Sequence, residues 1–164
     1  MVELLVVIAI IGVLTLITGP PVHRWMEERG VHEAAVQFAE SMQRAKLLAI
    51  RNSANSTITV NPATRQYTIT LNNPVRNEVV SLMDYRGSVV FANDPNTGAG
   101  PAGLITFTPQ GLVLPGAAGG AQSVVLSTNS PEISQKWFRV SVSVAGGISI
   151  YKWNPNNNSW ANVT

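Results

Sequence analysis

The sequence has no cysteine and few charged residues. Only 12% of its 164 residues are Asp, Glu, Lys or Arg, while 45% are hydrophobic. The absence of cysteine excludes disulfides, thiolate nucleophiles and thiolate-bound metals. Because globular domains usually carry about 25% charged residues, so low a charge content indicates that much of the surface is buried or packs against other copies of the chain.

Basic residues are sparse in the second half of the chain. The net charge is +2, and no Lys or Arg occurs between Arg86 and Lys136. Proteins that bind nucleic acid concentrate Lys and Arg on one face. Nucleic acid is therefore not an expected partner.

Motifs of catalysis and metal binding are also missing. No GxSxG, GxxxxGK[ST] or HExxH pattern is present. His23 and His32 lie nine residues apart without a carboxylate at a suitable spacing, so we expect them to be solvated. Asp94, Asn96 and Gly98 resemble part of a calcium loop, but no glutamate follows at the required distance, and an ordinary turn is favoured. We expect no enzyme activity, no cofactor and no metal.

An apolar run dominates the N-terminus. It follows Glu3, and residues 4–22 supply 19 uncharged positions. A helix needs about 20 apolar residues to cross a bilayer, so the segment is just long enough to span a membrane. An ionised carboxylate at its start is costly in hydrocarbon and indicates a functional site that requires a cation.

The run ends at Gly19, Pro20 and Pro21. Proline lacks a backbone donor and clashes with the preceding helical turn. These residues predict a hinge with a kink or melted turn in a longer helix, with plain helix termination as the alternative.

An amphipathic helix is predicted over residues 29–55. Apolar residues recur at steps of three and four, with polar residues between them. If this helix continues the first one, about 50 residues give a rod of roughly 80 Å, too long for a domain of this size, so the first half must project. The residues expected to pack on the rest of the domain are Val31, Ala35, Phe38, Met42, Ala45 and Ala49.

After residue 56 the hydrophobic period changes to two, which predicts strands. The two glycines at 146 and 147 favour a tight hairpin turn, and residues 93–101 and 115–120 read as exposed loops. The expected strands cover residues 57–60, 66–71, 78–82, 88–91, 104–107, 112–114, 123–126, 137–144 and 148–153. The fold class is therefore α+β, with an apolar helix over 1–28, a packed helix over 29–55 and an antiparallel β domain over 56–164.

Three tryptophans fall near the C-terminus. Trp137, Trp153 and Trp160 could form a platform for bases or sugars, but packing within the β domain is the favoured interpretation. The polar segment 154–160 is expected on the surface, with Trp160 docked.

The N-terminal motif resembles that of type IV pilins and type II secretion pseudopilins. In that family a peptidase removes a short basic leader, and a glutamate at the fifth position of the processed chain pairs with the N-terminal amine of a neighbouring subunit. Glu3 stands two positions earlier than this pattern. The resemblance implies that subunits assemble through Glu3, Leu4, Leu5, Val6, Val7, Ile8, Ile10, Ile11, Gly12 and Leu14.

The rest of the chain is similar to one branch, the GspH/FimT family of H-type pseudopilins and minor pilins. The resemblance rests on residues 44–52, 105–111, 138–142 and 146–148. Some members of that branch bind DNA through arginines beside the closing glycine turn. Here Ile148 and Ser149 follow that turn.

These resemblances imply a structural subunit of a type IV pilus-like filament or a type II secretion pseudopilus. Its N-terminal helix would lie in the inner membrane before assembly and in the core of a periplasmic or extracellular filament afterwards. The implied partners are copies of itself or other pilin-like subunits, a prepilin peptidase and an assembly platform. A DNA-capturing minor pilin and a membrane-anchored β-domain enzyme are the alternatives.

Overall fold

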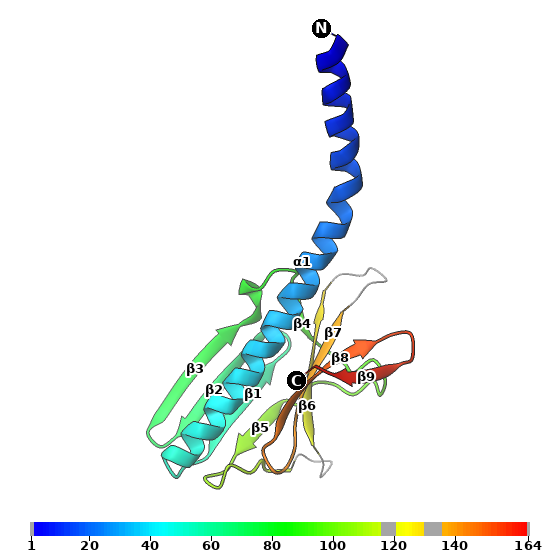
Figure 1. Cartoon of the computed structure of the whole chain (residues 1–164). Helices are drawn as coiled ribbons and strands as arrows, with labels where there is room; N and C mark the ends of the chain where they lie inside the picture. The colour runs from blue at the N-terminus through cyan, green and yellow to red at the C-terminus, as the bar shows by residue number, and fades with distance from the viewer. Residues whose placement is uncertain (1, 116–120, 130–135, 164) are drawn as a thin grey trace.

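The computed structural model describes residues 2–115, 121–129 and 136–163, except for the side chains of Leu5 and residues 15–24. Within them one long helix leads into two antiparallel sheets (Figure 1). Most of the loop expected at 115–120 lies outside the described residues. The elements are α1 (Val2–Arg51), β1 (Ser56–Asn61), β2 (Gln66–Asn72), β3 (Val75–Ser81), η1 (Leu82–Asp84), β4 (Val89–Ala92), β5 (Leu104–Phe107), β6 (Gln122–Thr128), β7 (Trp137–Val142), β8 (Ile148–Asn154) and β9 (Ser159–Asn162).

Helix α1 is continuous through Gly19, Pro20 and Pro21. The expected melted turn and the alternative of helix termination are therefore wrong for the backbone. The ribbon instead changes direction between the projecting stalk and the sheets (Figure 1). A helix absorbs a proline by bending, because the bend relieves the clash with the preceding turn while most hydrogen bonds remain.

The two sheets differ in size. The first has the strand order β3-β2-β1-β5, and the second has the order β4-β6-β7-β8-β9. In the first, Ile58 of β1 faces Ile69 of β2, and in the second Val140 of β7 faces Ile150 of β8. Such apolar cross-strand pairs fix the register, since a shift by one residue would turn each buried side chain to the solvent.

Several strand boundaries differ from the prediction. Strand β3 begins at Val75, and residues 112–114 form only an isolated bridge, Val113 with Phe107. Strand β9 lies in the segment expected to be a polar surface loop. Its pairing places Trp160 opposite Trp153. The residues of β9, Ser159 to Asn162, do not alternate between polar and apolar, so only the pairing with β8 reveals the strand.

The chain also turns earlier than expected after β7. Phe138 and Val142 are buried, but Val144, which the strand expected over 137–144 would place on the same face, is 44% exposed. The Ser143 amide donates to the Gly147 carbonyl at 2.9 Å, so the turn has begun before Val144. The two glycines do connect an antiparallel pair, β7 and β8.

The second half of α1 packs against both sheets (Figure 1). Val31, Ala35, Phe38, Met42, Ala45 and Ala49 have no exposed surface. The Phe38 ring meets Tyr67 of the first sheet edge-to-face at 4.9 Å and Phe91 of the second at 6.3 Å. The helix therefore joins two sheets into one core cluster.

Candidate assembly surface

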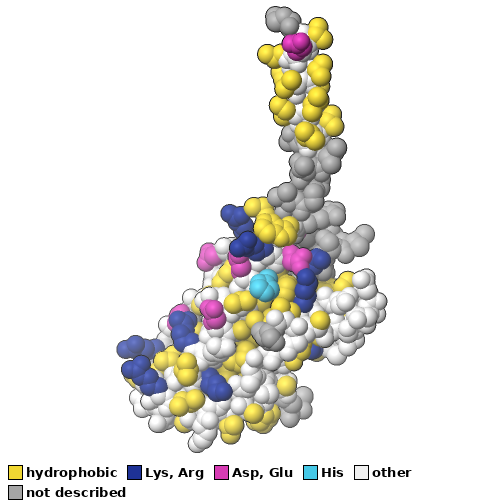
Figure 2. Space-filling view, in the orientation of Figure 1, with side chains coloured by type: hydrophobic (Ala, Val, Ile, Leu, Met, Phe, Trp, Pro, Cys, Tyr) yellow, Lys and Arg dark blue, Asp and Glu magenta, His cyan; other side chains and the backbone are white. Residues whose placement is uncertain are grey.

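The projecting part of α1 presents apolar side chains along the face that Figure 2 shows. Each large apolar side chain described there is more than half exposed, and an added Cβ at Gly12 would meet nothing within 4 Å. A helix that is apolar all round is normally buried. The exposed large apolar side chains of the stalk are Val2, Leu4, Val6, Val7, Ile8, Ile10, Ile11, Val13 and Leu14. Across the described residues, no helix contains an apolar stretch of sufficient length for a membrane crossing.

Glu3 lies in the first turn of this stalk and is exposed. The N-terminal end of a helix carries partial positive charge, which suits a carboxylate. The side chains of Leu5 and of the predicted hinge residues Gly19, Pro20 and Pro21 lie outside the description. The remaining predicted assembly residues lie together on one short, exposed segment of α1.

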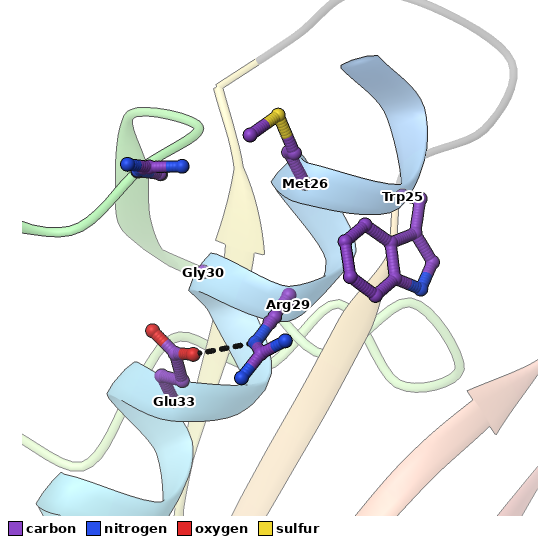
Figure 3. A pocket seen from close by; sticks show the side chains of 6 residues that line it. Trp25, Met26, Arg29, Gly30 and Glu33 are labelled. Atoms are coloured by element: carbon purple, nitrogen blue, oxygen red, sulfur yellow. Dashed lines mark hydrogen bonds and ion pairs between the residues drawn. The ribbon is translucent and has the colours of Figure 1, made fainter. Parts of the chain in front are cut away.

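A shallow hollow of about 350 Å³ lies at the neck, where α1 leaves the domain (Figure 3). Trp25 is 59% exposed there, and the Arg29 guanidinium lies 5.6 Å from its ring centroid. Arg29 Nε also donates to Glu33 Oε1 at 2.9 Å. A Cβ on Gly30 would meet the Arg86 carbonyl oxygen at 2.0 Å, so only glycine permits this approach of the helix to the loop.

Glu28 fastens α1 to the second sheet. Lys152 Nζ donates to its carboxylate, and Lys136 Nζ lies 3.6 Å from the other oxygen. Partial burial raises the pKa of Glu28, but the hydrogen bond and positive charge of Lys152, followed by Lys136, outweigh this and leave the pKa below its usual value. The ionised form is therefore favoured in the folded protein.

His32 and Asp94 each make contacts within the protein itself. The His32 ring meets Phe138 edge-to-face at 5.2 Å and is half-buried, so it is solvated only in part. The side chain of His23 lies outside the description. Asp94 Oδ1 accepts from the amides of Asn96 at 2.8 Å and Thr97 at 3.3 Å, which builds a turn. Within the described residues no group of His, Asp and Glu is placed to hold a metal.

The C-terminal tryptophans contact one another. Trp153 lies edge-to-face with Trp137 at 6.3 Å and with Trp160 at 5.2 Å. The Arg139 guanidinium lies 4.6 Å from the Trp160 ring centroid and 5.0 Å from that of Tyr151. These contacts hold β9 against β8.

A basic side chain does lie beside the closing glycine turn, and it comes from α1. Lys46 Nζ donates to the Gly146 carbonyl at 3.0 Å. An added Cβ at Gly146 would meet the Gly111 carbonyl oxygen at 2.2 Å. The residues after the turn gave no sign of this lysine, because it is a hundred positions away in the sequence.

No family model and no curated protein sequence matches the chain. A solved structure does: the chain is similar to the type IV minor pilin FimU of Pseudomonas aeruginosa, with a TM-score of 0.53 and 15% sequence identity. The match covers 84% of this chain and 96% of that one. The chain has the pilin-like fold.

This result confirms the α+β class and the long helix packed on antiparallel strands. Helix α1 forms both the projecting stalk and the part that packs on the sheets (Figure 1). At 15% identity the match bears on the fold alone. Membership of the GspH/FimT branch stays a prediction.

Proposed function

We propose that this protein is a structural subunit of a pilin-like filament, either a type IV pilus or a type II secretion pseudopilus. The exposed apolar stalk carries this proposal. Its large apolar side chains that the structure describes between Val2 and Leu14 are exposed to the surroundings and do not pack in the protein's own core. Apolar area in water costs roughly 25 cal/mol per Å², so the stalk requires another apolar environment.

Two environments meet that requirement in turn. Before assembly, the stalk would lie in the inner membrane, because residues 4–22 supply 19 uncharged positions. After assembly, stalks of neighbouring subunits surround it in the filament core, and Gly12 permits their close approach because its surroundings are open. The β domain then lies outside this core, in the periplasm or beyond the cell.

Glu3 would fix how deeply each stalk enters the core. A carboxylate surrounded by apolar side chains must be paired. The N-terminal amine of an adjacent subunit is the partner that the family resemblance implies. A subunit out of step would leave both charges uncompensated. A prepilin peptidase and an assembly platform would supply the processed chain and insert it.

The test compares filament yield of the full-length protein and a stalk variant, by electron microscopy and sedimentation after the membrane is removed. We expect wild type to form filaments and Ile8→Lys to form few, because a charge in the core has no partner. Leu112→Lys is the matched control, since Leu112 is an exposed apolar residue away from the stalk. Absence of wild-type filaments, or normal yield from Ile8→Lys, would contradict the proposal.

A further inference from the structure

The exposed side of α1 beyond the neck carries its charges sorted by sign. Glu33 and Glu40 come first, and Arg44 and Arg51 follow; all four are exposed. Steps of seven, four and seven residues return to nearly the same side of a helix with 3.6 residues per turn. We name this side the charged face, with an acidic half at Glu33 and Glu40 and a basic half at Arg44 and Arg51.

Residues of other elements extend each half. Beside the acidic half, Glu33, Glu40 and Tyr85 line a hollow of about 370 Å³, and the exposed Asp84 precedes Tyr85. Burial raises the pKa of Tyr85, and the negative charges of Asp84, Glu33 and Glu40 raise it further. The negative charges of these three carboxylates therefore all act at the Tyr85 hydroxyl.

Beside the basic half, Arg51 and Arg76 line a hollow of about 430 Å³ between the end of α1 and the β2–β3 hairpin, with Leu48 and Pro74. Lys and Arg side chains gather at this end of the domain, far from the stalk (Figure 2). The hollow combines apolar surface with two guanidinium groups and with Glu78, whose carboxylate is already paired with Arg44. It suits a partner that brings carboxylates.

Part of the charge is already compensated inside the molecule. Arg29 pairs with Glu33 at 2.9 Å, and Arg44 Nη2 donates to Glu78 Oε1 at 2.6 Å. In the part of the chain that the structure describes, Glu40 and Arg51 make no ion pair, and neither do Asp84 and Arg76. Two carboxylates and two guanidinium groups are thus left for a partner.

We propose that the charged face binds the same face of a neighbouring copy, with Glu40 of one copy paired to Arg51 of the next. This proposal rests on the filament function proposed above. Glu40 and Arg51 are eleven residues apart, which is about 16 Å along the helix. Two parallel copies displaced by that distance bring the acidic half of one against the basic half of the other. Because all subunits point the same way, the contact is head-to-tail and repeats.

A second copy explains the face better than a polyanion or an acidic peptide. Either of those would be attracted by Arg51 but repelled by Glu40 and Asp84 on the same side of the molecule. A copy of the chain carries both signs at the matching spacing. Contacts of this kind also select against wrong registers, since like charges then oppose each other.

The experiment reverses the charges in the full-length protein. We expect Glu40→Lys and Arg51→Glu each to lower filament yield by at least about tenfold at moderate salt, because like charges then oppose each other. The double variant Glu40→Lys/Arg51→Glu exchanges the signs on every copy and should restore the yield. Mixing the two single variants should also restore it, since one then carries two positive and the other two negative charges at these positions.

Arg65→Glu is the matched control, because it changes the net charge as Arg51→Glu does but lies in the turn between β1 and β2. Circular dichroism of each variant checks folding. Wild-type filaments with normal yields from both single variants would overturn this inference and leave the filament function standing. Folded single variants that stay defective in both the double variant and the mixture would overturn it as well. Absence of filaments from wild type would contradict the filament function itself.

Discussion

Two carboxylates of α1 lie in opposite surroundings. Glu28 is held by Lys152 and Lys136 of its own chain. Glu3 is exposed on the stalk, and no cation contacts it among the described residues. A charge paired within the subunit contributes to folding, whereas we propose that the charge on the apolar stalk contributes to assembly. Each therefore calls for a different measurement.

Glu3→Leu should enter the membrane at least as well as wild type, because the change removes a charge from the apolar run. It should nevertheless give few filaments or filaments out of register, because the pairing that aligns neighbouring stalks is lost. Glu3→Gln, which keeps the shape, should share the defect. The measurement compares protein in the membrane fraction with sheared filament. Normal filament yield from both variants would show that Glu3 has no pairing role.

Glu28→Gln should lower the thermal midpoint at neutral pH. Since its folded pKa is depressed, the ionised carboxylate contributes stability above its unfolded pKa, near 4.5, and this contribution is lost as the pH falls through the lower folded value. The difference between wild type and Glu28→Gln should thus shrink below about pH 4.5. Glu40→Gln is the control, because Glu40 makes no ion pair in the described part of the chain. A difference that stays constant from pH 7 to pH 3 would contradict this role of Glu28.

At the scale of elements, the backbone of α1 passes very close to the backbone of the β domain at one point. Gly30 lies where the helix passes the Arg86 carbonyl, and the rest of the buried stripe follows from Val31 onward. Helical periodicity predicts the stripe but not this approach. A glycine within a helix lowers its intrinsic stability, so its presence here has a tertiary cause.

Gly30→Ala should destabilise the protein although alanine favours helix by about 1 kcal/mol. The new Cβ would lie 2.0 Å from the Arg86 carbonyl oxygen. Moving helix and loop apart costs roughly 1–3 kcal/mol, which exceeds the gain. Gly12→Ala is the matched control: its Cβ would meet nothing, so the denaturation midpoint of the domain should be unchanged. Equal midpoints for Gly30→Ala and wild type would contradict this prediction, because they would show that the loop at Arg86 can move away from the helix without a cost in stability.

At the scale of the whole molecule, stalk and domain are separable. The core cluster begins at Val31, and the Glu28 contacts to Lys152 and Lys136 lie beyond the stalk. The half of α1 before Trp25 should therefore contribute to assembly and little to folding of the domain. Only the second half of α1 joins the two sheets.

A chain beginning at Trp25 should be a folded monomer that forms no filaments. It keeps the buried stripe, both sheets and Glu28, while it loses the exposed apolar surface that requires partners. Sedimentation velocity and the far-ultraviolet circular dichroism spectrum check the two parts of this expectation. Filaments from the truncated chain would show that the β domain, rather than the stalk, directs assembly.

The sequence by itself determined the apolar stalk, the amphipathic second half of α1 and most strands. Each depends on a period that a few neighbouring residues display: continuous apolar character, steps of three and four, or alternation. The buried residues from Val31 to Ala49 could be named in advance for that reason. The N-terminal motif pointed to the proposed assembly surface, because a carboxylate before an apolar run can be recognised in the sequence without knowledge of the fold.

The tertiary structure alone decided the order of the strands, strand β9 and the contacts of single side chains. Arg44 with Glu78, Lys46 with the Gly146 carbonyl, and Glu28 with Lys152 join residues far apart in the chain. Such contacts depend on which surfaces meet once the core is buried, and no local pattern records them. The charged face of α1 shows both contributions: helical spacing aligns Glu40 with Arg51, but only the fold decides that this side of the helix is exposed rather than buried.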